Sequence, residues 1–257
     1  MSLVPKLHLG TPPVLREISF RAPRSVVASV AQGRTILRGV WSLFCARKLL
    51  ALGMFVGALA LGALIWPHDQ ALLAKMHIWQ GEQEQVARSI AWFLGTWGDY
   101  PTYNVPLALA LWLYGAVTRS SAWRRIAVIA FLGATLAGLF DDCFRLTLGR
   151  PRPDTIAHTH MADGFYGITY ALSGGYQSFP SGHSASDFGT AAALIVTELP
   201  LGLITTAIAI GVVWARMELD RHYPSDVAVG SIIGIYFGLM TGFGAKLRRP
   251  RPRKTSP

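Results

Sequence analysis

The chain has 257 residues, of which 51% are hydrophobic and 15% are charged, and it carries a formal net charge of +10. Because an ordinary soluble domain has about 25% charged residues, this composition argues against a soluble enzyme, a disordered chain and a disulfide-stapled secreted domain. The two cysteines, Cys45 and Cys143, are too few for a disulfide framework. So much apolar surface with so few charges is typical of a protein that is surrounded by lipid.

Six apolar segments predict membrane-spanning helices, each of which needs roughly 20 mostly apolar residues. They cover residues 49–66, 101–117, 126–140, 184–196, 201–215 and 227–245, and the fourth and fifth are short. The expected fold is therefore all-α, a polytopic membrane protein with six transmembrane helices.

The loop between the first two predicted spans, residues 67–100, has apolar residues at helical spacing. One group lies in residues 72–79 and the other in residues 86–97, with a polar stretch between them. This spacing predicts two amphipathic helices on the membrane surface of the outer face. The loop either guides a lipid toward a site or packs over the bundle.

The basic residues are distributed unevenly along the chain. Seventeen of the 24 lysines and arginines fall within residues 1–48, 118–125 and 246–254. With six spans, these segments share one side of the membrane, which the positive-inside rule makes the cytoplasm. The sequence therefore predicts a bacterial-type inner membrane protein with cytoplasmic termini and an opposite face in the periplasm. A basic excess explained by topology gives no reason to expect a nucleic acid partner.

The same pattern divides the chain into three regions. Residues 1–47 form a basic cytoplasmic segment, residues 48–245 form the six-helix transmembrane domain, and residues 246–257 form a basic, proline-rich tail that is expected to be disordered. Residues 1–47 contain no compact apolar run before a small-residue cleavage site, so a cleavable signal peptide is not expected. The sequence gives no indication of the oligomeric state.

Three polar clusters lie where the predicted spans meet the outer face, in residues 145–153, 180–183 and 216–226. Charged groups at a membrane boundary are costly unless they are paired or functional. Arg145, Arg152 and Arg216 supply planar donor forks that suit phosphate oxygens. Ser181 and Gly182 precede a helix, whose N-terminal N–H groups would add further donors for an anion.

The clusters also contain two histidines. Asp226 follows His222 by four residues, and a carboxylate on one ring nitrogen would fix the tautomer and leave the other nitrogen nucleophilic. His183 would then be available to protonate a leaving oxygen. A lone histidine or arginine at a span boundary usually has a structural role, but three such clusters on one face together indicate phosphate chemistry.

The three clusters resemble the tripartite signature of the type 2 phosphatidic acid phosphatase superfamily, in its integral-membrane lipid phosphatase branch. The family pattern is Lys-x6-Arg-Pro, then Pro-Ser-Gly-His, then Ser-Arg-x5-His-x3-Asp. Here it reads Arg145-x6-Arg152-Pro153, Pro180-Ser181-Gly182-His183 and Ala215-Arg216-x5-His222-x3-Asp226. The spacing is met throughout.

The resemblance implies a role for each residue. His222 would attack phosphorus and form a phosphohistidine, Asp226 would orient His222, and His183 would protonate the leaving oxygen. The phosphate oxygens would be held by Arg145, Arg152, Arg216, Ser181 and Gly182. No metal or other cofactor is implied.

Two residues depart from the family pattern. Arg145 replaces the family's lysine and keeps the charge, and Ala215 replaces a serine and loses one hydroxyl contact to phosphate. These changes are expected to weaken or alter phosphate binding without abolishing activity. Arg150 offers a second register for the first motif, although the six-residue gap from Arg145 favours Arg152.

Two acidic residues near the motifs, Asp142 and Asp187, are candidates for tuning a motif arginine or histidine. Asp142 precedes Arg145 by three residues, and Asp187 follows His183 by four. The alternative is ordinary charge compensation.

The leading functional hypothesis is a membrane phosphatase that acts at the periplasmic face on a lipid phosphate or pyrophosphate. Related enzymes act on undecaprenyl pyrophosphate, phosphatidylglycerol phosphate, phosphatidic acid or lipid A phosphates. A lipid phosphotransferase that uses the same phosphohistidine is a second hypothesis. A non-catalytic transporter or lipid-phosphate-binding protein is a third, but binding alone would need only the arginines.

Overall fold

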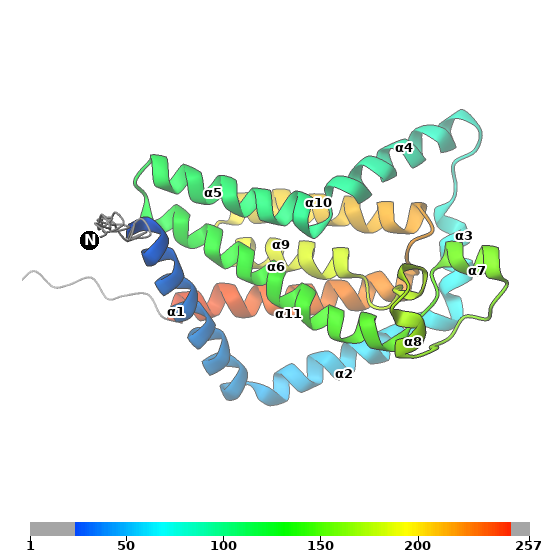
Figure 1. Cartoon of the computed structure of the whole chain (residues 1–257), viewed down its shortest axis with the longest axis horizontal. Coiled ribbons are helices and arrows are strands. Elements are labelled where there is room, and N and C mark those ends of the chain that lie inside the picture. The colour runs from blue at the N-terminus through cyan, green and yellow to red at the C-terminus, as the bar shows by residue number, and fades with distance from the viewer. Residues whose placement is uncertain (1–23, 248–257) are drawn as a thin grey trace, which may run out of the picture.

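The computed structural model describes residues 24–247, and every regular element in that range is a helix (Figure 1). The expectation of an all-α fold is confirmed, whereas most of the predicted C-terminal tail and the first half of the predicted N-terminal segment lie outside the described residues. The α-helices are α1 (Arg24–Ala46), α2 (Lys48–Ile65), α3 (Asp69–Met76), α4 (Glu82–Trp97), α5 (Val105–Val117), α6 (Ser121–Leu148), α7 (Pro153–Thr159), α8 (Ile168–Ala171), α9 (Gly182–Thr197), α10 (Leu199–Glu218) and α11 (Pro224–Leu247). Short η1 (Trp66–His68), η2 (Tyr100–Asn104, a π-helix) and η3 (Gly174–Tyr176) complete the set.

Each of the six predicted spans coincides with a helix, but the helices differ in length. Four segments of the described chain are long and apolar enough to cross a membrane, namely Lys48–Met76, Ser121–Leu148, Leu199–Glu218 and Pro224–Lys246. The helices at the second and fourth predicted spans, α5 and α9, have only 13 and 16 residues. The count of six spans therefore stays a prediction.

The short helix α9 is the centre of the bundle. It packs against α6, α10 and α11 (Figure 1). Most of its residues are buried, including the polar Ser184, Ser186, Asp187 and Thr190. Because neighbouring helices shield α9, its polar side chains can be satisfied within the protein rather than facing lipid.

Small residues let α11 approach α9 closely. A Cβ atom added to Gly230 or Gly234 would lie 2.5 or 2.4 Å from the backbone oxygens of Ser181 and Ala185, respectively. One turn further on, Gly238 meets the backbone oxygen of Gly189 in the same way. Glycines spaced four residues apart on one helix face are typical of tight packing in membranes, where van der Waals contact replaces the hydrophobic effect. This packing holds the start of α9 against the start of α11.

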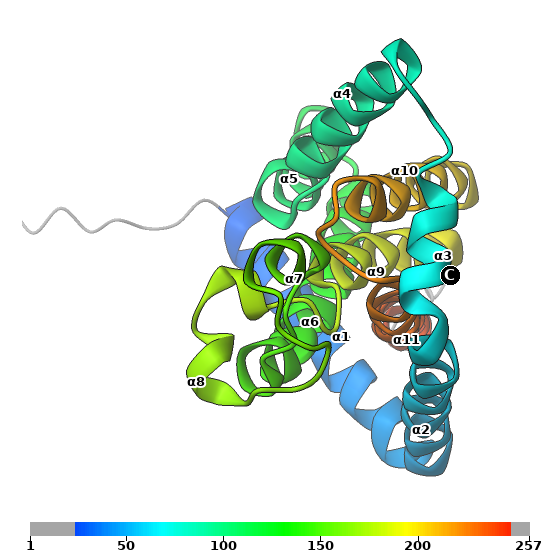
Figure 2. The ribbon, with the colours of Figure 1, turned by 90° about the vertical axis from the view of Figure 1, so that its right-hand side faces the viewer.

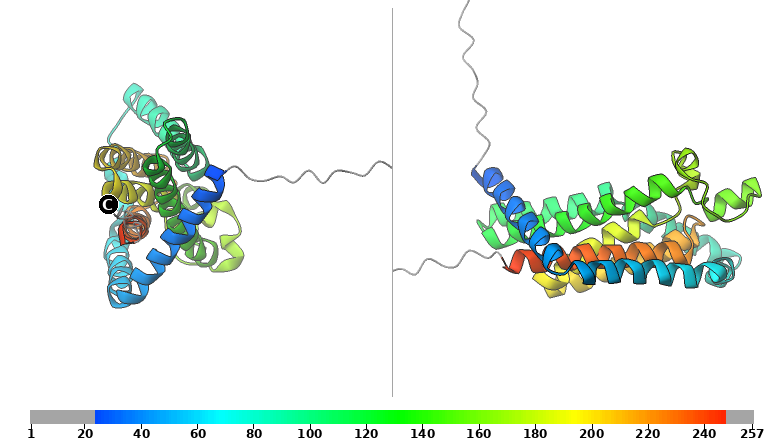
Figure 3. Two further views of the ribbon diagram at one scale, coloured as in Figure 1. Left: turned by 90° about the vertical axis from the view of Figure 1, so that its left-hand side faces the viewer. Right: turned by 90° about the horizontal axis from the view of Figure 1, so that it is seen from below.

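The two ends of the bundle differ in character. Helix α1 crosses one end obliquely, near the α5–α6 turn and the last turns of α11 (Figures 1 and 3). Arg119 lies in the α5–α6 turn, and Arg124 and Arg125 follow at the start of α6. The three motif clusters lie at the other end. The basic segments within the described chain are thus separated from the motifs by the length of the bundle.

The predicted outer-loop helices are α3 and α4. Helix α3 lies across the motif end of the bundle and contacts α10 and α11, whereas α4 packs along α10 and extends away from the centre (Figure 2). Several large apolar side chains of α4 are exposed, among them Val86, Ile90, Trp92, Phe93 and Trp97. This arrangement agrees with an amphipathic helix at a membrane surface.

Candidate active site

Local geometry at the end of α6 brings the first motif to the second. Gly149 ends the helix with φ of +67°, a conformation that favours glycine. The chain then turns so that Ser178 N donates to the carbonyl oxygen of Arg150 at 3.1 Å, and Arg152 N donates to that of Gly175 at 2.8 Å. The loop that leads into the second motif is therefore held against the first motif.

The second motif adjoins both of the others. Ser181 N donates to the carbonyl oxygen of Asp226 at 3.2 Å. A Cβ atom added to Gly182 would lie 3.5 Å from Cζ of Arg145. The structure thus brings together three clusters whose residues lie up to 81 positions apart in the sequence.

The ring of His222 is buried, with 1% exposure, and sits in the turn between α10 and α11. Its Nδ1 lies 2.7 Å from the carbonyl oxygen of Ser178. Because a carbonyl oxygen can only accept, Nδ1 carries the proton and donates, which leaves the Nε2 lone pair unprotonated. This is the tautomer that a nucleophilic imidazole requires.

The hydrogen-bond partner of His222 differs from the sequence expectation. Asp226 Oδ2 lies 3.8 Å from Nδ1, beyond hydrogen-bond distance. Its carboxylate instead accepts from the Ser178 hydroxyl at 2.6 Å, from Tyr223 N at 2.8 Å and from Arg150 at 2.5 Å. Asp226 therefore acts on His222 through space and through Ser178, and not through a direct hydrogen bond.

Three arginines surround His222 electrostatically. The positive charges of Arg216, Arg152 and Arg145 all act on its ring. The Nε atoms of Arg152 and Arg216 are buried and have no hydrogen-bond partner among the described residues. Buried donors are normally satisfied, so two guanidinium Nε donors without a partner, whose charges act on one imidazole, indicate a site for an anion.

The second motif histidine, His183, faces a residue that the sequence analysis did not single out. Its Nε2 lies 3.4 Å from Oδ1 of Asp99, which precedes η2. His183, Arg145, Gly182, Asp99 and Tyr100 share a pocket of about 280 Å³. Asp99 was missed because no motif spacing links it to position 183, and only the packing of η2 on α9 brings the two together.

The N-terminus of α9 adds donors to this pocket. Ser181 is the N-cap residue, and the helix begins at Gly182. The N–H groups of the first turn have no acceptor within the helix and carry its positive dipole end. Ser181 itself is fully buried, and its hydroxyl accepts from Ser184 Oγ at 3.0 Å. Gly182 and the first turn are therefore better placed than the Ser181 hydroxyl to supply N–H donors.

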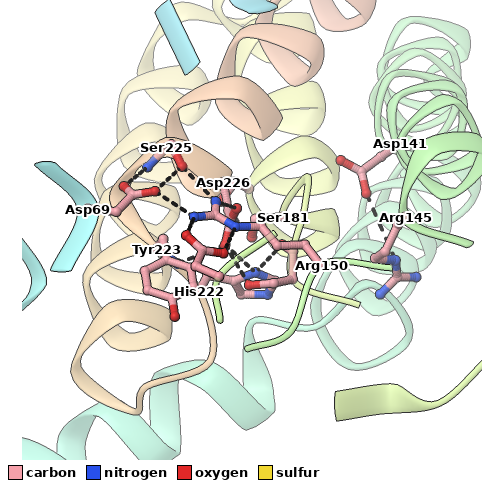
Figure 4. A network of polar contacts seen from close by, with 12 residues as sticks. Asp69, Asp141, Arg145, Arg150, Ser181, His222, Tyr223, Ser225 and Asp226 are labelled. Atoms are coloured by element: carbon pink, nitrogen blue, oxygen red, sulfur yellow. Dashed lines mark hydrogen bonds and ion pairs between the residues drawn. The ribbon is translucent and has the colours of Figure 1, made fainter. Parts of the chain in front are cut away.

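The two candidate tuning residues have different surroundings. Asp142 accepts hydrogen bonds from Nε of Arg145 at 3.1 Å and from Nη2 of Arg145. The buried Asp141 lies 4.0 Å from Nε of the same arginine (Figure 4). Asp187 accepts from Asn104 Nδ2 at 2.8 Å, deeper in the bundle. Asp142 thus contacts a motif residue, whereas the hydrogen bond of Asp187 ties α9 to the start of α5.

The remaining sequence features are placed as follows. Ala215 is fully buried on α10. Cys45 and Cys143 are both free. Within residues 24–247, no group of three or more His, Cys, Asp or Glu side chains is placed to hold a metal ion.

The pH dependence of the site follows from the surroundings of His222. Burial and the charges of Arg216 and Arg152 hold the pKa of His222 well below its ordinary value, so the imidazole stays neutral as the pH falls through the usual histidine range. We expect Arg152→Gln to raise this pKa and to move the acid limb of kcat/KM to higher pH, by roughly 1 unit. The pH profiles of kcat/KM for Arg152→Gln and for the unmodified protein would be measured with the same substrate, so that ionisation of the substrate affects both profiles equally.

Arg221→Gln is the matched control for this prediction. Arg221 neighbours His222 in sequence, but its side chain is exposed and pairs with Asp154 at 2.9 Å. Its profile should follow that of the unmodified protein. Superimposable acid limbs for Arg152→Gln and the unmodified protein would contradict the electrostatic role of Arg152.

Comparison with known proteins places this geometry in a family context. A family model of the PAP2 superfamily matches residues 126–248. The chain is 33% identical over 118 residues to the lipid A 1-phosphatase of Rhizobium johnstonii, covering 45% of this chain and 46% of that protein. It is also 33% identical over 149 residues to the decaprenylphosphoryl-5-phosphoribose phosphatase of Mycobacterium tuberculosis, covering 56% of this chain and 76% of that protein. The crystal structure of a PAP2 type phosphatidylglycerolphosphate phosphatase from Bacillus subtilis matches 76% of this chain and 93% of that chain, with 21% identity and a TM-score of 0.49.

The matches cover different shares of the related proteins. The chain spans about half the length of the lipid A 1-phosphatases that it matches. It spans 76% of the mycobacterial phosphatase, and the region that the family model covers contains all three motif clusters. The chain belongs to the PAP2 superfamily.

Proposed function

We propose that the protein is an integral-membrane phosphatase that removes phosphate from a lipid phosphate or pyrophosphate through a phosphohistidine at His222. The observation that carries the proposal is the buried His222 imidazole, with its Nε2 lone pair free, among three arginines of which two have an unpaired Nε. A phosphoryl group bound to those arginines would be held beside the nucleophile. Phosphate binding alone would not require the oriented imidazole.

In the first step of the proposed reaction, Nε2 of His222 bonds to phosphorus while the bond from phosphorus to the lipid oxygen breaks. His183 donates a proton to that oxygen, so the lipid leaves as an alcohol, or as a lipid phosphate when the substrate is a pyrophosphate. Arg145, Arg152 and Arg216, with the first-turn N–H groups of α9, hold the oxygens on which negative charge develops. Burial and the charge of Arg216 lower the pKa of His183, and the charge of Asp99, 3.4 Å away, opposes this shift. The negative charge of a bound phosphate would oppose it as well and favour the protonated acid.

In the second step, water attacks the phosphohistidine. His183 takes a proton from that water, the bond from phosphorus to Nε2 breaks, and inorganic phosphate leaves. Asp226, at 3.8 Å from His222 Nδ1, stabilises the positive charge that the ring carries while it is phosphorylated. An acceptor lipid in place of water would turn the same intermediate to phosphotransfer.

We also propose that the site faces the periplasm across a bacterial inner membrane. The α5–α6 turn and the start of α6, which carry three arginines, lie at the end of the bundle opposite the motifs (Figure 1). This supports a cytoplasmic location for that end under the positive-inside rule. A site at the membrane boundary suits a substrate whose lipid chain stays in the bilayer. Two relatives are named as phosphatases of lipid A and of a decaprenyl-linked phosphate. These names support the proposal that the substrate is a large lipid phosphate.

The test is a panel of lipid phosphates with the purified full-length protein in detergent. The panel holds lipid A, undecaprenyl pyrophosphate, phosphatidylglycerol phosphate and phosphatidic acid, and the readout is released inorganic phosphate. At least one member should be hydrolysed, and the activity should be insensitive to chelators. Loss of the lipid phosphate without release of inorganic phosphate would indicate transfer to an acceptor. No consumption of any lipid would overturn the proposal.

A further inference from the structure

The side chain of Arg150 is fully buried at the centre of a network of polar contacts (Figure 4). Its Nη1 donates to Asp226 Oδ1 at 2.5 Å and to Ser225 Oγ at 2.8 Å. Its Nη2 donates to Asp69 Oδ2 at 2.8 Å and to Asp163 Oδ2 at 2.6 Å, and its Nε donates to Asp163 Oδ1 at 2.9 Å. A guanidinium group has five N–H donors, and in Arg150 all five are used.

This saturation separates Arg150 from Arg152 and Arg216, whose Nε atoms are unpaired. The rings of Trp66 and Tyr223 also lie against its guanidinium, each with its centroid 4.3 Å from Cζ. Arg150 therefore has no donor left for a phosphate group. The structure thus decides between the two registers of the first motif in favour of Arg152.

The network leads from Arg150 to His222 by a continuous chain of hydrogen bonds. Arg150 holds Oδ1 of Asp226, and Oδ2 of Asp226 accepts from the Ser178 hydroxyl at 2.6 Å. The carbonyl oxygen of the same Ser178 accepts from His222 Nδ1 at 2.7 Å. All of these groups are buried, so displacing one of them leaves the next polar or charged group without its hydrogen-bond partner.

Asp69 ties this chain to the outer loop. It is the first residue of α3 and is almost fully buried. Besides accepting from Arg150, it accepts from Ser225 N at 2.8 Å and from the Ser225 hydroxyl. Ser225 lies in the first turn of α11, next to Asp226. Asp69 thus fixes both Arg150 and the helix start that carries Asp226.

We propose that Arg150 and Asp69 are positioning residues, which hold the imidazole of His222 in line for attack through Asp226 and Ser178. The inference rests on the proposed function, because it assigns these residues to the same nucleophile. Neither residue has a role in the three-motif signature, and Asp69 lies 153 positions before His222 in the sequence. Their loss should impair the chemical step more than the binding of substrate.

The first test is a set of three substitutions assayed for kcat and KM on a lipid phosphate that the unmodified protein hydrolyses. Asp69→Asn keeps the shape and removes the charge, Arg150→Lys keeps the charge and removes the fork, and Ser178→Ala removes only the hydroxyl link. Because a small displacement of a reacting group costs up to about 100-fold in rate, we expect kcat to fall roughly 10- to 100-fold for Asp69→Asn and Arg150→Lys, and less for Ser178→Ala. KM should stay within about threefold.

Asp154→Asn is the matched control, since Asp154 is an outer-face aspartate whose side chain pairs with Arg221 at 2.9 Å. Its kcat should match that of the unmodified protein. Folded variants of Asp69 and Arg150 with unchanged kcat, or with KM raised and kcat unchanged, would overturn the inference. If both variants fail to fold, Ser178→Ala decides, because it leaves the Arg150 ion pairs intact, and an unchanged kcat there would overturn the inference.

A second measurement keeps this inference separate from the proposed function. Orthovanadate can take up the five-coordinate geometry of phosphoryl transfer only when His222 is in line, whereas inorganic phosphate needs only the arginines. Protection against thermal unfolding by each anion requires no turnover. We expect Asp69→Asn to lose most of the protection by vanadate and to keep the protection by phosphate. Equal protection by vanadate of Asp69→Asn and of the unmodified protein would refute the positioning role. If the unmodified protein is protected by vanadate but hydrolyses no lipid phosphate, the proposed phosphatase function alone is refuted.

Discussion

Replacing His222 by alanine is expected to abolish phosphate release from the lipid substrate, with a fall in kcat on the order of 10⁴-fold or more. The physical reason is that the substitution removes the imidazole whose Nδ1 is held by the Ser178 carbonyl oxygen and on whose ring Arg216, Arg152 and Arg145 act. Without it, the proposed phosphohistidine cannot form, and the reaction would need direct attack by water on phosphorus. Binding of inorganic phosphate should persist in the variant, because the arginines remain.

Two measurements check this prediction. Steady-state phosphate release gives the loss of rate, and acid-labile incorporation of radiolabelled phosphate into protein should occur in the unmodified protein and not in His222→Ala. His158→Ala is the matched control, since His158 is an exposed histidine of α7 on the same face, and it should retain activity. Labelled protein in His222→Ala would show that another residue is the nucleophile.

The second large effect is expected for His183→Ala, and it should depend on the leaving group. A lipid alcohol leaves poorly without a proton, so the loss of the general acid should lower kcat on the lipid phosphate by about 10² to 10⁴-fold. An activated aryl ester such as p-nitrophenyl phosphate has a phenolate that leaves without protonation. Formation of the phosphohistidine from that ester should therefore change far less.

The same variant should also accumulate the intermediate. His183 is proposed to activate the water that hydrolyses the phosphohistidine, so its loss slows the second step as well. With the aryl ester, His183→Ala should give a burst of phenolate followed by a slow steady state. The two substrates serve as controls for each other in one variant. Equal losses on both, with no burst, would contradict a role for His183 in proton transfer.

The sequence identified the apolar segments better than the helix ends. The third predicted span, residues 126–140, lies within α6, which runs from Ser121 to Leu148. The apolar run ends at Asp141 and Asp142, but the helix continues because its backbone hydrogen bonds do not depend on apolar side chains. Asp141 is then buried beside Arg145, inside the protein rather than in lipid.

Convergence of the motifs was also accessible from the sequence. The positions of the predicted spans place all three clusters at one face of the membrane. Within the clusters, six residues separate Arg145 from Arg152 and five separate Arg216 from His222. The resemblance to a known signature then names the residues. This reasoning selected His183, His222 and the three arginines, which the structure places at one end of the bundle.

The partner of His222 shows where spacing fails. The four-residue interval to Asp226 suggests one turn of a helix, but α11 begins at Pro224, so His222 precedes the helix. Proline is favoured at the first helical position, where no N–H is needed. Hence the side chains of His222 and Asp226 do not stack on one helix face, and a backbone carbonyl from Ser178 takes the place expected for the carboxylate.

By itself, the sequence determined that this is an all-α membrane protein, that its basic segments and its motifs belong to opposite ends, and which residues are candidates for binding phosphate. These properties depend on composition and on neighbours along the chain. Only the tertiary structure decided that Arg150 is saturated by three carboxylates, that Asp69 and Ser178 connect it to His222, and that Asp99 faces His183. Those contacts join elements far apart in the sequence and involve backbone carbonyls, so they depend on how the helices pack and not on any spacing that the chain displays.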